Sequence, residues 1–375
     1  MHHSFFNNRF RRLRTVLQGR LKGRRAKGFT LIELLVAMII GSLIVVALLT
    51  LVVQLTETNQ KDAARTQVQQ DMQSAMDYIA QDLRSAVFVY NGECLAGNGT
   101  PTSGADFSKT CPGIVKYIPT AITQPPNQKM AVLAFWRTKE LPQRIKDLCK
   151  ANANENALGS DNSDTVSNNI MTKAKVPCLA GYSYSLVVYG LDTTNPGNKW
   201  NGNARLERYE LSQFPSNPAD EKDQTPGFVD PLEEPEFTFQ QWPFKDGGGA
   251  AVNRQAVAPS GQSATLVDFV DTTKSDNASK PKCDEFGADA PAQDRSLSPT
   301  DKSAPPFRSF YACVRDGGIV VPVNNVTPTP TNQDVLLVLK GNVTGQGGFA
   351  RVNDNSERVS PLQTRVLVRG IVGKK

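Results

Sequence analysis

Apolar residues are distributed differently in the first hundred residues of the chain and in the rest. Residues 29–53 read FTLIELLVAMIIGSLIVVALLTLVV, where 20 of 25 residues are apolar and Glu33 is the only charged one. A helix rises about 1.5 Å per residue, so this segment spans roughly 37 Å and exceeds the ~30 Å hydrocarbon core of a bilayer. We therefore predict a membrane-spanning helix over residues 29–53.

A stripe of apolar residues continues the helical pattern beyond this segment. Its members recur at spacings of three and four: Ala64, Val68, Met72, Ala75, Met76, Ile79, Leu83, Ala86 and Val87. Residues 42–91 contain neither Gly nor Pro to interrupt a helix. We predict one helix from about residue 29 to residue 88, whose amphipathic half, 54–90, packs under a globular domain. A coiled-coil partner is the alternative explanation of the stripe.

Residues 91–375 have the pattern of a β-rich globular domain. Short runs of β-branched and aromatic residues predict six strands: Ala131–Arg137, Tyr182–Gly190, Ala204–Leu211, Phe310–Val314, Val335–Val343 and Thr364–Val372. In the third, which reads ARLERYEL, we expect Leu206 and Tyr209 to point inward and the charged residues outward. Residues 213–262 and 284–307 are rich in Pro, Asp, Glu, Gly and Ser, which predicts insertions outside the core. We expect an α+β fold in which an antiparallel sheet lies on the C-terminal half of the long helix.

Positive charge is concentrated at the N-terminus. The chain has 42 Lys and Arg against 36 Asp and Glu, and nine of the basic residues but no acid lie within residues 1–28. By the positive-inside rule, this segment stays in the cytoplasm and everything after residue 53 lies outside it. Without these nine residues, 33 basic face 36 acidic ones, which gives the remaining chain a charge of about −3. We therefore expect no nucleic-acid partner.

Histidine is nearly absent, which excludes several kinds of enzyme. The two histidines, His2 and His3, both lie in the basic N-terminal segment. Without that segment, the chain has no histidine for a Ser-His-Asp or Cys-His site, a general base or a metal site. Neither a calcium-loop pattern nor a Gly-rich phosphate loop is present, and the acidic cluster at 233–236 is interpreted as a solvated loop. We expect no catalytic site, no metal and no cofactor.

All the cysteines follow the membrane span, in the compartment where disulfides persist. They are Cys94, Cys111, Cys149, Cys178, Cys283 and Cys313. Pairing sequence neighbours (94–111, 149–178 and 283–313) closes the smallest loops, and we predict three disulfides with this pairing. No C-x-x-C pair occurs, so a zinc site is not expected.

Glu33 is an anomaly in an otherwise apolar segment. A carboxylate inside a membrane span is costly and marks a functional position that has a partner. No Lys, Arg or His occurs between Gly28 and Lys61 to neutralise it. A cut before Phe29 would create an α-amino group nearby, which is the cation we expect. The alternative is a Glu side chain that reaches the cytoplasmic interface.

The segment Lys27–Leu34 resembles the cleavage and methylation signature of type IV prepilins and type II secretion pseudopilins. Gly28 precedes the cut, Phe29 follows it, and Glu33 is the fifth residue of the mature chain, at the start of an unbroken apolar helix. The resemblance implies that a prepilin peptidase removes the leader, residues 1–28, and N-methylates Phe29. It also implies a role for Glu33 in filament assembly.

The resemblance further implies a structural minor pilin or pseudopilin with a type IV pilin-like fold, and not an enzyme. Such a subunit is a single-pass protein of the inner membrane, in contact with its lipid. An inner-membrane assembly platform then inserts it, with other pilins, into a pilus or pseudopilus for motility, adhesion or secretion. The segments MDYIAQDLRSAVF and ARLERYEL are similar to PilW-like minor pilins, and QDLRSAVF and the long loops resemble a hormogonium polysaccharide secretion pseudopilin.

Two other classes are alternatives. One is a membrane-anchored extracytoplasmic binding protein or exoenzyme whose signal anchor is not cleaved. The other is a DNA-uptake pilin, which needs a basic surface for phosphates, and the negative charge of the chain after residue 28 argues against it.

Overall fold

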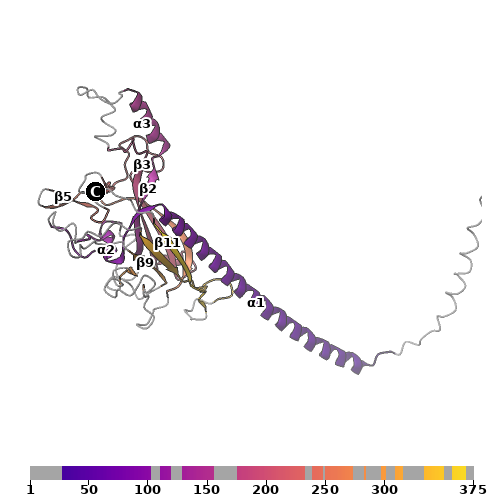
Figure 1. Cartoon of the computed structure of the whole chain (residues 1–375). Coiled ribbons are helices and arrows are strands. Elements are labelled where there is room, and N and C mark those ends of the chain that lie inside the picture. Colours follow the sequence, from indigo (N-terminus) through magenta and orange to yellow (C-terminus); the bar gives the residue numbers. More distant parts are fainter. Residues whose placement is uncertain are drawn as a thin grey trace, which may run out of the picture. The chain divides into compact units, whose positions relative to one another are not determined.

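A computed structural model describes residues 28–102, 110–119, 129–155, 175–232, 239–247, 250–272, 283, 297–300, 309–315, 333–349 and 357–368. The chain divides into two units, Met1–Asn59 and Gln60–Lys375. Helix α1 (Leu31–Arg84) begins in the first unit and ends in the second. Figure 1 shows α1 as the long helix at the start of the described chain.

The long helix ends earlier than its sequence pattern predicts. α1 has 54 residues, about 81 Å at the usual rise per residue, and stops at Arg84 rather than near residue 88. The next residues form strand β1 (Ala86–Val89), which pairs with strand β2 (Lys129–Glu140). The prediction of helix up to residue 88 is wrong because pairing with β2 and burial of Ala86 and Val89 outweigh the local helical pattern.

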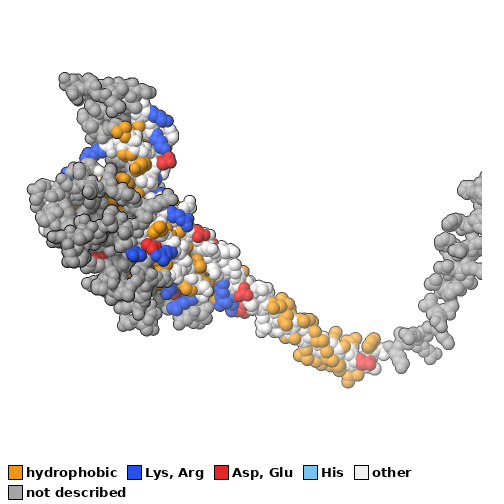
Figure 2. Space-filling view, viewed as in Figure 1, with side chains coloured by type: hydrophobic (Ala, Val, Ile, Leu, Met, Phe, Trp, Pro, Cys, Tyr) orange, Lys and Arg blue, Asp and Glu red, His pale blue; other side chains and the backbone are white. Residues whose placement is uncertain are grey.

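The two parts of α1 have different surfaces. Large apolar side chains from Leu31 to Leu55 are between 47% and 85% exposed, and Figure 2 shows this part of the helix covered with them. From Ala64 onward one face is buried, formed by Ala64, Val68, Met72, Ala75, Met76, Ile79, Ala80, Asp82 and Leu83. The predicted stripe and its packing under a globular domain are thus confirmed for residues 64–83. Asp82 is the charged member of this face.

In the described residues of the second unit, the β structure consists of two larger antiparallel sheets and a small hairpin. The five-stranded sheet has the order β1-β2-β3-β4-β7, with β3 at Tyr182–Asp192, β4 at Ala204–Ser212 and β7 at Gln262–Val270. The four-stranded sheet has the order β11-β10-β9-β8, with β8 at Leu297–Ser298, β9 at Phe310–Arg315, β10 at Asp334–Leu339 and β11 at Leu362–Leu367. The hairpin pairs β5 (Phe244–Asp246) with β6 (Ala251–Asn253). The short helices are α2 (Gly92–Ala96) and α3 (Gln143–Glu155), with 3-10 turns at Ile114–Lys116 and Pro196–Asn198.

An inner core joins the second part of α1 to both larger sheets. Met72 and Ile79 of α1 belong to one buried cluster with Phe135 and Tyr189 of the five-stranded sheet and Leu337 of the four-stranded sheet. The sequence predicts one sheet on the helix, and the structure has two. A long N-terminal helix packed on antiparallel sheets and stapled by three disulfides is an α+β, type IV pilin-like fold.

An outer core covers the opposite face of the five-stranded sheet. Trp136 of β2 packs there against Phe239 and Trp242, with ring centroids 6.0 and 5.5 Å apart. Val229 belongs to the same cluster, and its carbonyl accepts a hydrogen bond of 2.9 Å from Trp242 Nε1. The stretch 213–262, expected to lie outside the core, therefore supplies large core side chains. The sequence pattern did not reveal these residues as core, because they are scattered through a Pro- and Gly-rich stretch without the spacing of a strand or a helix. The other expected insertion, 284–307, lies mostly outside the described residues.

The six predicted strands are present as β2, β3, β4, β9, β10 and β11, with shifted ends. The end of the sixth prediction, beyond Val368, lies outside the described residues. Leu206 and Tyr209 of ARLERYEL are both buried in β4, as expected, but in two different cores. Leu206 faces the inner core and Tyr209 the outer core, because residues three apart in a strand point to opposite faces. The charged residues between them are not on an exterior surface, since Arg208 is only 8% exposed.

All six cysteines form disulfides, and they pair as sequence neighbours: Cys94–Cys111, Cys149–Cys178 and Cys283–Cys313. The first links α2 to the segment before the 3-10 turn at Ile114–Lys116. The second links α3 to the chain before β3, and the third holds Cys283 against β9. A bridge of this loop size typically stabilises a domain by about 2–4 kcal/mol.

Candidate functional site

The junction between Gly28 and Phe29 lies in open surroundings. A Cβ added to Gly28 would meet no atom within 4 Å, and Phe29 is 85% exposed. Nothing in the described chain therefore requires glycine at position 28 for packing. Both residues of this bond are exposed in the described chain.

A capping box between Thr30 and Glu33 starts α1. The Thr30 N–H donates to Glu33 Oε2 at 3.0 Å, the Thr30 hydroxyl donates to the same oxygen at 3.1 Å, and the Glu33 N–H donates to Thr30 Oγ1 at 3.3 Å. These bonds satisfy donors that the first turn of a helix leaves without partners. Sequence reasoning missed Thr30, although Thr-x-x-Glu before an apolar run is the signal of a capping box.

The Glu33 carboxylate is only half satisfied by this arrangement. Both bonds from Thr30 go to Oε2, and Oε1 has no partner among the residues that the structure describes. The next cation along the sequence after Gly28 is Lys61. In Glu33, Oε2 is therefore hydrogen-bonded to Thr30, and Oε1 can accept a hydrogen bond from another molecule.

The part of α1 that follows this site is apolar on every side. Within the described residues it is the one helix long and apolar enough to cross a membrane. A soluble helix packed on a core shows a polar face, which this segment lacks. Its exposed side chains need lipid or other apolar helices around them.

A buried charge cluster fastens the other end of α1 to the five-stranded sheet. The Asp82 carboxylate accepts hydrogen bonds from Arg208 Nε at 2.8 Å, Arg137 Nη1 at 3.0 Å and the Tyr189 hydroxyl at 2.6 Å. The three donors come from β4, β2 and β3, so one side chain of α1 is bonded to three neighbouring strands. This fixes the position of the helix along the sheet.

Glu210 completes the charge cluster from β4. Its carboxylate lies 2.8 Å from Arg208 Nη1, 2.9 Å from Arg137 Nη2 and 3.0 Å from Lys139 Nζ. Although burial opposes ionisation, these three cations hold the pKa of Glu210 well below its usual range. Burial and the negative charge of Asp82 raise the pKa of Tyr189, so its hydroxyl stays protonated and donates.

None of the cluster was identified from the sequence. The sequence contains one signal of the cluster: Leu206, Arg208 and Glu210 are spaced two residues apart, so they lie on the same face of the strand. However, charged residues at this spacing are equally typical of a face that is exposed to solvent. Only the approach of Asp82 from α1, more than a hundred residues away in the chain, decides that these charges are buried.

The sequence-predicted site residues belong to different units. Gly28, Phe29 and Glu33 lie in the first unit, and the six cysteines lie in the second. In the described part of the chain, no three side chains of His, Cys, Asp or Glu are grouped as metal ligands. The N-terminal site thus consists of an exposed Gly28–Phe29 junction and a hydrogen-bonded Glu33, and the cysteines form disulfides in the second unit.

Comparison with known proteins identifies the N-terminal segment. Residues 23–49 match the prokaryotic N-terminal methylation motif. No curated protein and no solved structure matches the chain. The chain is therefore type IV prepilin-like in this segment, and the motif leads into the helix that, within the described residues, is long and apolar enough to cross a membrane.

Proposed function

We propose that the chain is the precursor of a minor pilin or pseudopilin, a structural subunit that enters a type IV pilus or a type II secretion-like filament. One observation carries the proposal: the methylation motif leads directly into a helix that is apolar and exposed on every side. Such a helix serves first as a membrane anchor and then as a packing surface for other apolar helices. The large globular part favours a minor subunit over a repeated shaft subunit.

The proposed maturation follows from the sequence boundaries. A prepilin peptidase cuts between Gly28 and Phe29 and methylates the new N-terminus. Residues 29–53 then span the inner membrane with the N-terminus in the cytoplasm, and residues 91–375 lie outside. An assembly platform inserts the subunit among other pilins. The PilW-like and hormogonium polysaccharide resemblances support the proposal that it is a minor subunit of such a machine.

Substitution of Gly28 tests the processing step. Gly28→Val should leave the full-length precursor in the membrane, because the added side chain must fit the peptidase. Gly23→Val, inside the leader but away from the junction, is the matched control and should mature normally. Mass spectrometry of the membrane-extracted protein reads both outcomes, and the mature wild type should begin with N-methylated Phe29. An intact Met1 in the wild type would instead favour an uncleaved anchor for a binding protein or exoenzyme.

Glu33 is the residue we propose for assembly. Cleavage creates an α-amino group at Phe29. Oε1 of Glu33 can accept a hydrogen bond from the α-amino group of a neighbouring subunit. In lipid, the pair neutralises two charges that are each costly alone. The pair therefore favours association of subunits rather than folding of one.

Two substitutions separate this charge from the helix cap. Glu33→Gln keeps a side chain that completes a capping box but removes the charge, whereas Glu33→Ala removes both. If the ion pair drives assembly, both variants should be cleaved and inserted, yet co-purify poorly with sheared filaments at matched membrane levels. Normal recovery of Glu33→Gln with loss of Glu33→Ala would assign the effect to the cap. Equal recovery of all three proteins would remove Glu33 from assembly.

A further inference from the structure

Among the residues that the structure describes, most of β7 forms an unpaired edge of the five-stranded sheet. β7 pairs with β4 over Gln262–Val270, and at its end Val270 forms an isolated antiparallel bridge with Gly341. In this bridge the Asn342 N–H donates to the Phe269 carbonyl at 2.8 Å, and the Asp271 N–H donates to the Lys340 carbonyl at 3.0 Å. In the described structure, the backbone of residues 262–268 has no strand or side-chain partner on the side away from β4. An edge strand of this kind is a template for pairing with another strand.

The other edges of the two larger sheets are shorter or covered. On β1, the Gln333 side chain pairs with both backbone groups of Val89, at 2.7 Å to the N–H and 2.8 Å to the carbonyl. β8 has two residues, and β11 has six with Arg365 at its centre. By contrast, β7 has nine residues without Pro, Lys or Arg, and its charged residue, Asp268, is tied to Arg205 of β4 at 2.9 Å. Among the devices that usually block an edge, β7 thus lacks a proline and a Lys or Arg, although its pairing with β4 shifts register twice between Thr265 and Val270.

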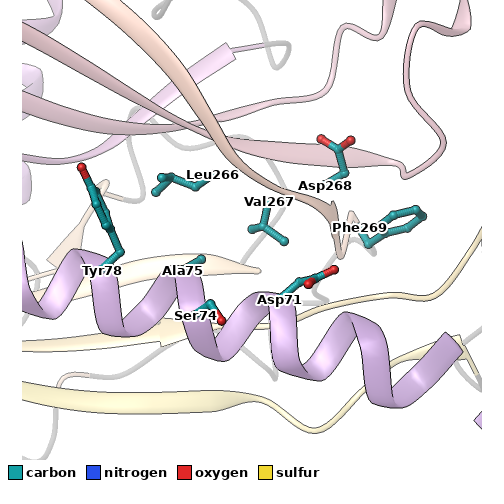
Figure 3. Close-up of a pocket in the computed structure, with 8 residues that line it drawn as sticks. All are labelled: Asp71, Ser74, Ala75, Tyr78, Leu266, Val267, Asp268 and Phe269. Atoms are coloured by element: carbon teal, nitrogen blue, oxygen red, sulfur yellow. The ribbon is translucent and has the colours of Figure 1, made fainter. Parts of the chain in front are cut away.

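A groove of about 460 Å³ runs between this edge and α1. Asp71, Ser74, Ala75 and Tyr78 of α1 form one wall, and Leu266–Phe269 of β7 form the other. Figure 3 shows the α1 side chains on successive turns of the helix, opposite Leu266 and Val267. Tyr78 is 45% exposed, although a neighbouring residue on α1, Ile79, is fully buried. A strand added to β7 would cover the Tyr78 ring and the open backbone edge together.

The groove also has an unbalanced negative charge. Asp71 accepts a hydrogen bond from Gln67 Nε2 at 2.8 Å and has no cationic partner among the described residues. A strand that carries a Lys or Arg would supply this partner, and apolar or small side chains would face Ala75 and Leu266. The groove thus selects an extended segment of mixed apolar and basic character.

We propose that an extended segment of a neighbouring pilin subunit adds to β7 as a further strand, with a Lys or Arg side chain at Asp71. This inference rests on the proposed function, because α1 is the element through which subunits pack in a filament, and a segment beside α1 is then one from the next subunit. Backbone bonds along residues 262–268 supply affinity, and the α1 wall selects the side chains.

Cross-linking in cells tests the proposal with the full chain. A photo-crosslinking amino acid at Ala264, which is exposed on β7, should form an adduct with another pilin-type subunit. The cross-linked peptide, identified by mass spectrometry, should be an extended segment with a Lys or Arg. The same probe at Leu367, 61% exposed on the edge strand β11, is the matched control and should give no such adduct. Asp71→Lys should abolish the Ala264 adduct.

Amide exchange distinguishes an added strand from any other occupant. In chain recovered with filaments, exchange of the outward amides of residues 262–268 should slow by on the order of tenfold or more relative to the detergent-solubilised subunit. An adduct with lipid, with a helix or with β7 of a second copy would overturn the proposal, as would unchanged exchange or an adduct insensitive to Asp71→Lys. If the chain is processed and co-purifies with filaments but gives one of these contradicting results, the proposed strand addition at β7 fails and the proposed function does not. If it is neither processed nor recovered, the proposed function fails as well.

Discussion

Glu210 is surrounded by three cations in the interior of the globular part. Arg208, Arg137 and Lys139 each lie within 3.0 Å of its carboxylate. Charges withdrawn from water are costly unless they are paired and hydrogen-bonded, and removal of one partner leaves the others uncompensated. The charge cluster therefore makes the attachment of α1 dependent on every one of its members.

Glu210→Gln should lower the free energy of unfolding at pH 7 by about 3–5 kcal/mol, because Arg137, Arg208 and Lys139 lose their shared counter-charge. Denaturant titration of the mature chain in detergent, followed by tryptophan fluorescence, measures the difference. The matched control is Glu140→Gln, since Glu140 is an exposed carboxylate paired with Lys146 at 2.6 Å and should leave stability unchanged. A loss as small as that of the control would contradict the role of Glu210.

The pH dependence follows from the lowered pKa of Glu210. A depressed pKa contributes stability above the unfolded value, about 4.3 for Glu, and this contribution is lost as the pH falls below it. The difference between wild type and Glu210→Gln should thus narrow by about 1.4 kcal/mol for each pH unit below that value. A difference that stays constant from pH 7 to pH 3 would argue that Glu210 is not ionised in the folded chain.

At the scale of elements, α1 serves two environments with one continuous helix. Its first part has no polar face and is built for lipid and other helices, whereas its second part has a single buried face. The change lies between residues 53 and 64, where polar residues such as Glu57 and Lys61 enter the sequence. A helix needs no break at this point, because both surfaces are compatible with the same backbone.

Ile79→Ala should destabilise the second part of α1. Ile79 is fully buried in the inner core, and loss of such a side chain costs about 2–5 kcal/mol through lost burial and the cavity left behind. Asp77→Ala, two residues away on an exposed face, is the control and should have little effect. Thermal unfolding of the mature chain in detergent compares them, and equal melting temperatures would argue against packing of α1 on the sheets.

At the scale of the whole molecule, three disulfides hold segments that the sheets alone do not bury. α3 packs through a small cluster of Leu141, Ile145, Val176 and Phe214, and the Cys149–Cys178 bridge lies beside it. So few buried residues provide little stability by themselves. The bridge adds a covalent link between α3 and the chain before β3.

Protein recovered from the extracytoplasmic side should contain no free thiol, as measured by thiol labelling under denaturing, non-reducing conditions. Stoichiometric labelling of two or more cysteines would contradict this.

Replacing both Cys149 and Cys178 by Ser should raise amide exchange in α3 while β2 and β3 stay protected. Replacing Cys94 and Cys111 instead is the control, because that bridge belongs to the outer core and should leave α3 unchanged.

Local patterns predicted what depends on neighbours in sequence. The apolar run 29–53, the stripe from Ala64 to Leu83 and the six strands are periodicities within one element, so each could be identified before its partner was known. The methylation motif is likewise a contiguous segment. The cysteine pairing followed from the closure of short loops between sequence neighbours.

Tertiary structure decided whatever depends on distant residues. Ala86–Val89 is a strand because β2 lies beside it, Arg208 is buried because Asp82 arrives from α1, and the aromatic residues of 213–262 are core because the sheet presents Trp136 to them. The sequence by itself determined the long apolar helix, the methylation motif and the class of fold, since helix period, segment length and motif are local properties. It could not determine which charges pair or which sheet edge stays open, because those depend on contacts that form only when the chain has folded.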